Sequence, residues 1–182
     1  MTAPETNGRD ERLPGERRVL GIDPGLAVTG YGVIEGHDSR ARMIASGIVR
    51  TSTKTSRAER LGRIFEAVSD LLDEQRPDEL AIEQQFVAKN VRSAMSIGEA
   101  RAAVMVAAAT RGVPVYEYAP RSVKESVTGF GGAPKEQVQQ MVAVHLHLDE
   151  LPHPLDVSDA LAIALTRLAE SRLERALARS GR

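Results

Sequence analysis

The sequence predicts a single α/β domain in which a five-stranded mixed sheet is flanked by helices. Three observations lead to this fold class. Three apolar segments follow one another with short polar links, a pattern typical of a meander of antiparallel strands. Helix-spaced segments then alternate with two short apolar strands, and a run of helices ends the chain. At 182 residues, the chain is long enough for one domain with a sizeable core.

The strands are expected where apolar residues are dense and turn-forming residues flank them. The polar link "GHDSRAR" separates the second strand from the third. The fourth strand opens the segment Glu79–Phe86 and ends in Glu83. The other expected strands are Val19–Asp23, Thr29–Glu35, Met43–Arg50 and Val115–Tyr118.

The helices are expected where apolar residues recur every three or four positions. The first runs from about Leu61 to Leu72 and stops before Pro77. A long alanine-rich helix covers about Arg92 to Thr110. Two more helices begin near Pro120 and Pro134, joined by the flexible segment "GFGGAP", and the last begins near Asp156 and continues past Leu168.

Composition divides the chain into three parts. Residues 1–17 are polar and are expected to form a disordered N-terminal tail, without the apolar core of a signal peptide or membrane anchor. Residues 18–170 are expected to form the folded domain, and residues 171–182 a basic C-terminal tail. The chain has no cysteine, and its apolar stretches are too short to span a bilayer. Both features suit a protein of the reducing cytoplasm.

Carboxylates stand at the ends of the expected strands and at the start of the last helix. Asp23 precedes Pro24 and Gly25, so it could begin a type II turn or supply a metal ligand. Glu83 ends an apolar strand, and its position alone favours an ordinary surface residue. Asp156 and Asp159 lie on one face of a first helical turn, where an N-cap would also explain them.

A bound metal ion would explain why these acids should lie close together. Two carboxylates about 4 Å apart repel by about 4 kcal/mol at an effective dielectric of 20, so a cluster requires a cation or a proton. Mg²⁺ prefers oxygen ligands, and two such ions can activate water and stabilise a leaving oxygen. No residue in the sequence is a good candidate for a covalent nucleophile, so metal-activated water is the expected attacking group.

Basic residues concentrate in one part of a chain whose net charge is −1. Between residues 89 and 135 there are seven bases and three acids, an excess of four positive charges. Such an uneven distribution suits a phosphate-binding face, although an ordinary solvated surface explains it equally well.

Four motifs together resemble the RuvC Holliday-junction resolvases of the RNase H-like fold. They are "GIDPG…TGYGV", "AIEQQFVAKN", "YAPRSVKESVTGFGGAPKEQVQQMV" and "DVSDALAIAL", in the family's order and at similar spacing. The resemblance extends from Val19 to about Leu168. It implies an endonuclease that resolves four-way DNA junctions by paired symmetric nicks in recombination and repair, and leaves 5′-phosphate and 3′-hydroxyl ends.

The resemblance also implies the site and the partners. The catalytic and metal-binding residues would be Asp23, Glu83, Asp156 and Asp159, holding Mg²⁺ (two ions per site), for which Mn²⁺ could substitute. The partners would be junction DNA, a second copy of the chain in a homodimer to which the alanine-rich helix contributes, and the RuvA–RuvB branch-migration complex. The expected DNA contacts are Phe86, Lys89, Asn90, Arg92, Arg121, Lys124 and Lys135. Phe86 would stack on an unpaired base, although a core position would also explain it.

Three other functions would each explain part of the sequence. Actin-like kinases and ATPases also begin with "GIDPG"-like strands, but they need two lobes and about twice this length. An RNase H-like nuclease that acts on an RNA–DNA hybrid is a closer alternative. In a third, non-catalytic alternative, the basic segment binds junctions while the acids only cap and turn.

Overall fold

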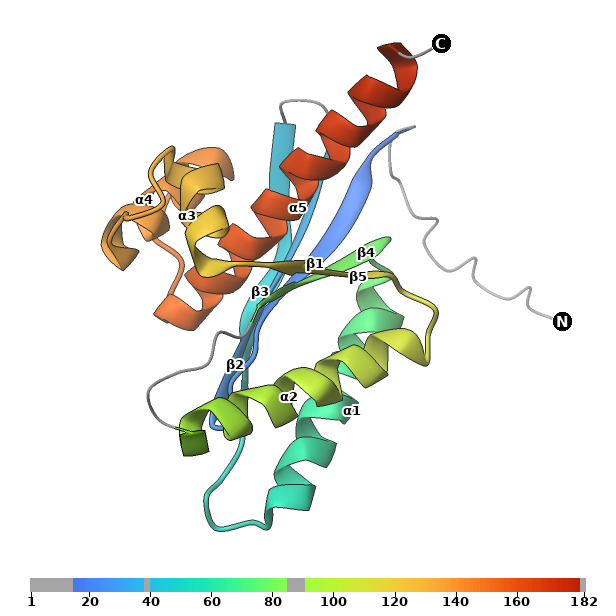
Figure 1. Ribbon diagram of the computed structural model, residues 1–182, viewed down its shortest axis with the longest axis vertical. Coiled ribbons are helices and arrows are strands. Elements are labelled where there is room, and N and C mark those ends of the chain that lie inside the picture. The colour runs from blue at the N-terminus through green and yellow to red at the C-terminus, as the bar shows by residue number, and fades with distance from the viewer. Residues whose placement is uncertain (1–14, 38–39, 85–90, 181–182) are drawn as a thin grey trace, which may run out of the picture.

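The computed structural model describes residues 15–37, 40–84 and 91–180. The described chain forms one five-stranded sheet with helices on both of its faces (Figure 1). The strands are β1 Arg17–Asp23, β2 Val28–His37, β3 Arg40–Arg50, β4 Glu79–Glu83 and β5 Val115–Tyr118. The helices are α1 Arg57–Gln75, α2 Val91–Ala109, α3 Pro120–Thr128, α4 Lys135–His145 and α5 Leu155–Ser180.

The sheet has the mixed topology that the sequence predicts. Its strand order is β3-β2-β1-β4-β5. β1, β2 and β3 form an antiparallel meander, whereas β1–β4 and β4–β5 pair in parallel. The carboxyl ends of β1, β4 and β5 therefore meet at one edge of the sheet, where Asp23 and Glu83 are the last strand residues.

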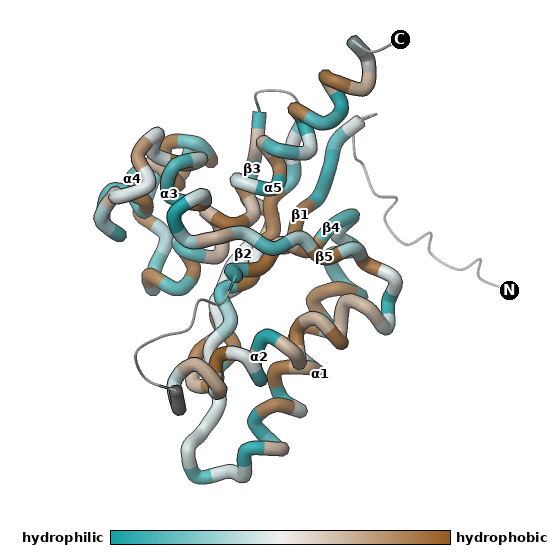
Figure 2. The backbone as a smooth tube through the Cα atoms, in the orientation of Figure 1, coloured by the Kyte–Doolittle hydropathy of each residue, from teal (hydrophilic) through white to brown (hydrophobic). Residues whose placement is uncertain are grey.

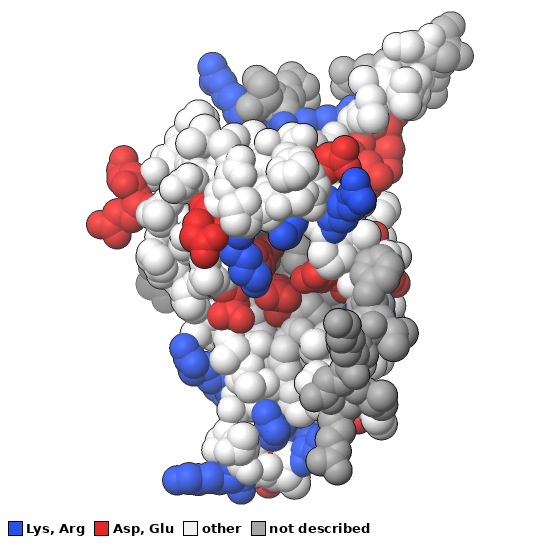
Figure 3. Space-filling view, turned by 60° about the vertical axis from the view of Figure 1, so that its left-hand side comes forward, with Lys and Arg blue, Asp and Glu red and all other residues white. Residues whose placement is uncertain are grey.

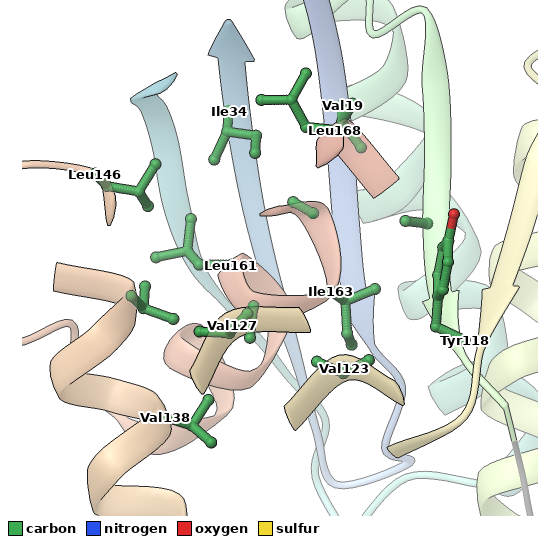
Figure 4. Close-up of a cluster of buried hydrophobic side chains, with 14 of the residues drawn as sticks. Val19, Ile34, Tyr118, Val123, Val127, Val138, Leu146, Leu161, Ile163 and Leu168 are labelled. Atoms are coloured by element: carbon green, nitrogen blue, oxygen red, sulfur yellow. The ribbon is translucent and has the colours of Figure 1, made fainter. Parts of the chain in front are cut away.

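Two hydrophobic clusters attach the helices to the sheet. One cluster joins the sheet to α1 and α2, and the other joins its opposite face to α3, α4 and α5. In Figure 4, Val123 and Val127 of α3 lie close to Ile163 and Leu161 of α5. Figure 2 shows the hydrophobic stretches where α5 crosses the sheet and along α1 and α2.

Glycines allow α5 to lie unusually close to the sheet. A Cβ atom at Gly21 would stand 2.1 Å from the carbonyl oxygen of Ala160. One at Gly32 would stand 2.5 Å from a methyl group of Leu161. These glycines are needed for space, since neither has a left-handed backbone conformation.

Helix α1 begins earlier than the apolar periodicity predicts. Ser56 is its N-cap and forms a capping box with Glu59, in which each side chain binds the other residue's backbone N–H. The helix starts at Arg57 and ends at Gln75, followed by Arg76 in a left-handed conformation just before Pro77. The stop at Pro77 is therefore as expected, while the start lies one turn before Leu61.

Both ends of the domain extend beyond the expected boundaries. β1 begins at Arg17, and the Gly15 carbonyl accepts a hydrogen bond from Arg175 Nη1 (2.9 Å). The residues from 171 onward, expected to form a basic tail, continue helix α5 as far as Ser180. Ser171 is buried, and Arg172 Nη2 donates to the Arg40 carbonyl (3.0 Å), which ties this part of α5 to the sheet.

Within the described ranges, none of the helices combines the length and apolar character needed to cross a membrane.

Candidate active site

Asp23 and Glu83 lie side by side at the ends of two parallel strands. The register pairs Ile22 of β1 with Ile82 of β4, and the two acids follow one residue later. Side chains alternate along a strand, so Asp23 shares the face of Gly21, which packs against α5. The strand pairing therefore places both carboxylates on the α5 side of the sheet.

Asp156 reaches the same place because Gly30 leaves room for it. Gly30 of β2 is paired with Asp23 across the β1–β2 ladder. A Cβ atom at Gly30 would stand 2.1 Å from the Asp156 carbonyl oxygen and 3.0 Å from the Asp156 Cβ. The first turn of α5 thus lies directly on the strand beside Asp23, and Asp159 follows one turn later on the same helix face.

The acids influence one another's ionisation. The pKa of Asp23 is raised from 3.8 to about 7, mainly by burial and further by the negative charges of Glu83, Asp159 and Asp156. The pKa of Glu83 is also raised, first by burial and then by Asp159. All three partners thus lie close enough to Asp23 to disfavour its charged form.

Lys135 brings a positive charge into direct contact with this group. Its Nζ lies 2.5 Å from Asp159 Oδ2. This hydrogen bond, with the nearby charges of Asp159, Asp23 and Glu83, raises the pKa of the lysine. Lys135 also opposes the pKa rise of Asp23. As the first residue of α4, it places a fixed cation among the carboxylates.

A cleft of about 270 Å³ opens beside these groups. Glu83, Asp159, Lys124 and Lys135 contribute its polar lining, and side chains of α3, α4 and α5 form its apolar wall. Lys124 Nζ donates to the Ala133 carbonyl at 2.7 Å. Figure 3 shows acidic side chains gathered on one face of the molecule, with basic side chains next to them.

The donor set suits a hard divalent cation. Carboxylate oxygens are the ligands that Mg²⁺ and related ions prefer. Burial and the neighbouring acids disfavour the charged forms of Asp23 and Glu83, and a bound cation would offset this effect. In the described part of the chain, no three acidic or histidine side chains are already grouped closely enough to hold an ion. Asp159 instead faces Lys135, so binding an ion would require the carboxylates to turn toward a common point.

Two alternative explanations of the acids are wrong. A type II turn would need Gly25 in a left-handed conformation, but the described glycines with positive φ are Gly15, Gly112 and Gly129. Gly25 serves for space, because a Cβ there would lie 2.3 Å from the Val28 carbonyl oxygen. Asp156 is not an N-cap either, since α5 begins at Leu155 and Asp156 lies inside its first turn.

The predicted DNA contacts fall into three groups. Phe86, Lys89 and Asn90 lie outside the described residues, and of Arg92 only its place in the first turn of α2 is described. Lys124 and Lys135 face the cleft. Arg121 is exposed on the first turn of α3.

Two bases that contribute to the predicted basic surface have structural partners. Arg101 forms an ion pair with Glu117 and donates to the Glu83 carbonyl at 3.3 Å, so it fixes the end of β4 beside the acids. Arg111 forms a bidentate pair with Asp73. The sequence does not predict this role of Arg101, because its partners are distant in the chain and follow no local pattern.

Comparisons with known proteins show the family to which the chain belongs. The model of the family "Crossover junction endodeoxyribonuclease RuvC" matches residues 19–167. The chain belongs to the RuvC family. Its members are metal-dependent nucleases, and the prediction of this family from the four sequence motifs is confirmed.

The relatives cover most of the chain. The RuvC of Brevibacillus brevis is 48% identical over 82% of this chain and 90% of its own length. The RuvC of Chlorobium phaeovibrioides is 50% identical over 82% of this chain and 80% of its own length. The structure of T. thermophilus RuvC in complex with a Holliday junction substrate superposes with a TM-score of 0.84 at 42% identity, covering 87% of this chain and 96% of that one. The expected RNase H-like fold is therefore confirmed.

Proposed function

We propose that this protein resolves four-way DNA junctions by paired, symmetric, metal-dependent nicks, and that Asp23, Glu83, Asp156 and Asp159 form its catalytic site. Membership of the RuvC family supports the reaction class. One observation carries the assignment of residues: the carboxylate of Asp23 is buried and feels the charges of the three other acids. A divalent cation at this position would relieve that repulsion.

In this proposal the metal is Mg²⁺, with Mn²⁺ as a substitute, and two ions occupy each site. Bound metal would supply an activated water and would neutralise the leaving oxygen. The protein would supply oxygen ligands from two strand ends and one helix, held in place by the sheet pairing and by Gly30. Lys124 and Lys135, which line the cleft, would bind the phosphates of the cut strand.

The proposed assembly is a homodimer, because two symmetric nicks require two sites. Helix α2 supports this proposal. It buries Ala100, Val104 and Ala107 in the core but exposes Met95 (59%) and Val106 (51%). Association with a RuvA–RuvB branch-migration complex is proposed from the family resemblance alone.

The experiment that tests this function offers the protein three fluorescently labelled substrates, with and without Mg²⁺. They are a four-way junction, a linear DNA duplex and an RNA–DNA hybrid. We expect metal-dependent nicks at symmetric positions in the junction only, and products that DNA ligase reseals. Cleavage of the hybrid in preference to the junction would contradict the proposed substrate. Binding of the junction without cleavage, in Mg²⁺ and also after its replacement by Mn²⁺, would contradict the catalytic role.

A further inference from the structure

Phe130 is an exposed aromatic residue that the proposed site does not use. It lies between α3 and α4, and 63% of its surface is accessible to solvent. Single exposed apolar residues are common on protein surfaces, so exposure alone gives it no role. The turn around it, however, holds its backbone and its ring in place.

The backbone at Phe130 is held by hydrogen bonds on both sides. Its N–H donates to Thr128 Oγ1 at 3.1 Å, and its carbonyl accepts from the Ala133 N–H at 3.1 Å. The preceding residue, Gly129, closes α3 in a left-handed conformation (φ 77°), and its N–H binds the Glu125 carbonyl. The segment expected to be a flexible joint is therefore an ordered turn.

Two glycines of this turn pack against exposed side chains, one from the turn and one from α3. A Cβ at Gly132 would stand 2.7 Å from the ring of Phe130, so the ring lies against the backbone of Gly132. A Cβ at Gly131 would stand 2.7 Å from Cγ of Arg121, so the stem of Arg121 lies against Gly131. An exposed aromatic ring and an exposed arginine thus pack on two consecutive glycines.

The turn also joins the two lysines that line the cleft. Ala133, which binds Phe130, accepts a hydrogen bond from Lys124 through its own carbonyl (2.7 Å). Lys135 is five residues after Phe130, so their Cα atoms are at most about 18 Å apart. One strand of DNA rises about 3.4 Å per base pair, so Phe130 is within about five nucleotides of a phosphate bound at Lys135.

We infer that Phe130 stacks on a base or deoxyribose of the substrate close to the cut phosphate, while Arg121 binds a neighbouring phosphate. This inference rests on the proposed function, since it takes DNA as the substrate. A fixed, exposed aromatic ring beside cations is what sequence-tolerant binding of an unpaired nucleotide requires. Phe130 would therefore be a binding residue that positions the strand, with no part in the chemical step.

The first test uses the absence of tryptophan from the chain. The variant Phe130→Trp carries a single indole, whose fluorescence reports on its surroundings. Adding a four-way junction in EDTA should quench this emission strongly and should protect the indole from iodide. A junction that binds with unchanged emission and unchanged iodide access would overturn the inference.

The second test compares Phe130→Ala, Phe130→Leu and Phe130→Tyr for junction binding in EDTA and for single-turnover cleavage in Mg²⁺. Loss of one stacked base corresponds to about 5- to 150-fold weaker binding, expected for Phe130→Ala. Phe130→Tyr should bind the junction as tightly as the wild type does. The affinity of Phe130→Leu should lie between those of the wild type and Phe130→Ala. The matched control is Leu177→Ala, which removes an apolar side chain of similar exposure (64%) near the far end of α5 and should change nothing.

The outcomes distinguish this inference from the proposed function. A wild type that cuts the junction, alongside a Phe130→Ala variant that binds and cuts it equally well, overturns the inference alone. A Phe130→Ala variant that loses binding only because its subunits separate, as shown by sedimentation, also overturns it. A wild type that ignores junctions but cuts another nucleic acid overturns the proposed substrate, and the Phe130→Trp titration with that nucleic acid still decides the role of Phe130.

Discussion

The main chain of Asp156 lies on Gly30, so the first turn of α5 is seated beside Asp23, the residue with which Gly30 pairs across the sheet. A side chain at position 30 would meet a backbone oxygen at 2.1 Å, and no rotamer change can relieve such a contact. The position of two of the four acids therefore depends on the absence of a single methyl group.

Gly30→Ala should move the start of α5 away from the sheet. We expect a loss of about 1–3 kcal/mol in the free energy of unfolding, as for other overpacked sites. Cleavage should fall much more than junction binding, because Asp156 and Asp159 are displaced from Asp23. Urea unfolding, cleavage and binding assays measure the three quantities.

Gly62→Ala provides the matched control for this substitution. Gly62 lies within α1, and a Cβ there meets nothing within 4 Å. Alanine is the better helix former, so this variant should be more stable by about 0.5–1 kcal/mol and fully active. Equal effects of the two variants would show that the space at Gly30 has no special role.

The ion pair between Lys135 and Asp159 predicts opposite effects on metal binding and on cleavage. Lys135→Met removes a positive charge that competes with the metal. A divalent ion about 6 Å from a unit charge is disfavoured by about 1.4 kcal/mol even at the dielectric of water, so the variant should bind Ca²⁺ roughly tenfold more tightly. Cleavage should nevertheless fall by about 100-fold, because the transition state loses a cation.

Calorimetry with Ca²⁺ and single-turnover cleavage in Mg²⁺ test this pair of effects. Lys54→Met is the control, because Lys54 is exposed in the turn before α1, outside the cleft. Weaker metal binding by Lys135→Met would contradict the role of Lys135 as a competing cation.

The raised pKa of Asp23 predicts how stability depends on pH when metal is absent. Between 3.8 and about 7 the folded protein holds a proton that the unfolded chain has released. The free energy of unfolding should therefore fall as the pH rises through this window, by roughly 4 kcal/mol at most. Above about pH 7 the ionised carboxylate should impose its full penalty.

Asp23→Asn should be less sensitive to pH than the wild type and more stable at about pH 8 in EDTA. Saturating Mg²⁺ should stabilise the wild type at this pH and should stabilise Asp23→Asn less. Urea unfolding of both proteins between about pH 5 and pH 8 measures the difference. Parallel pH profiles would show that Asp23 ionises normally.

A buried ion pair fixes α5 to β4 away from the acids. Arg167 is 1% exposed, and its Nε donates to Glu79 Oε2 at 2.8 Å. From Arg167 to Asp159 is eight residues of helix, about 12 Å, and from Glu79 to Glu83 is four residues of strand, about 13 Å. Because these two lengths are nearly equal, the ion pair at one end of the two segments brings Asp159 and Glu83 together at the other end.

Arg167→Met should therefore cost about 3–5 kcal/mol of stability, because it leaves Glu79 buried without its partner. Adding Glu79→Leu should recover most of this loss, since a buried ion pair can be replaced by apolar residues at little cost. Urea unfolding of the single and double variants distinguishes this from a general packing effect. A double variant as unstable as the single one would contradict it.

The sequence predicts most of the strands and helices because their signals are local. Alternation, helical spacing and Pro77 locate elements within a few residues, and the strand ends place Asp23 and Glu83 correctly. The sequence also contains a signal that α5 continues past residue 170. Arg167, Glu170 and Glu174 have the spacing of side chains that meet along one helix, and in the structure Arg167 forms ion pairs with both acids.

The rest depends on contacts between distant segments. Lys135 and Asp159 are 24 residues apart, and Arg101 lies 18 residues from the Glu83 carbonyl that it binds. No periodicity reports such pairs. The sequence does not predict the close fit of Gly30 to Asp156 either, since the two residues are distant in the chain. A glycine at position 30 would equally suit a turn. The assignment of the four acids to catalysis stays a prediction.

The central claim is that these acids form one metal site that cuts DNA junctions, and Asp23→Asn tests it most directly. Cleavage and binding of a labelled four-way junction should be measured for the wild type and this variant, across a titration of Mg²⁺. We expect paired nicks by the wild type only, with equal junction binding by both proteins. Cleavage by Asp23→Asn at the wild-type rate would contradict the claim.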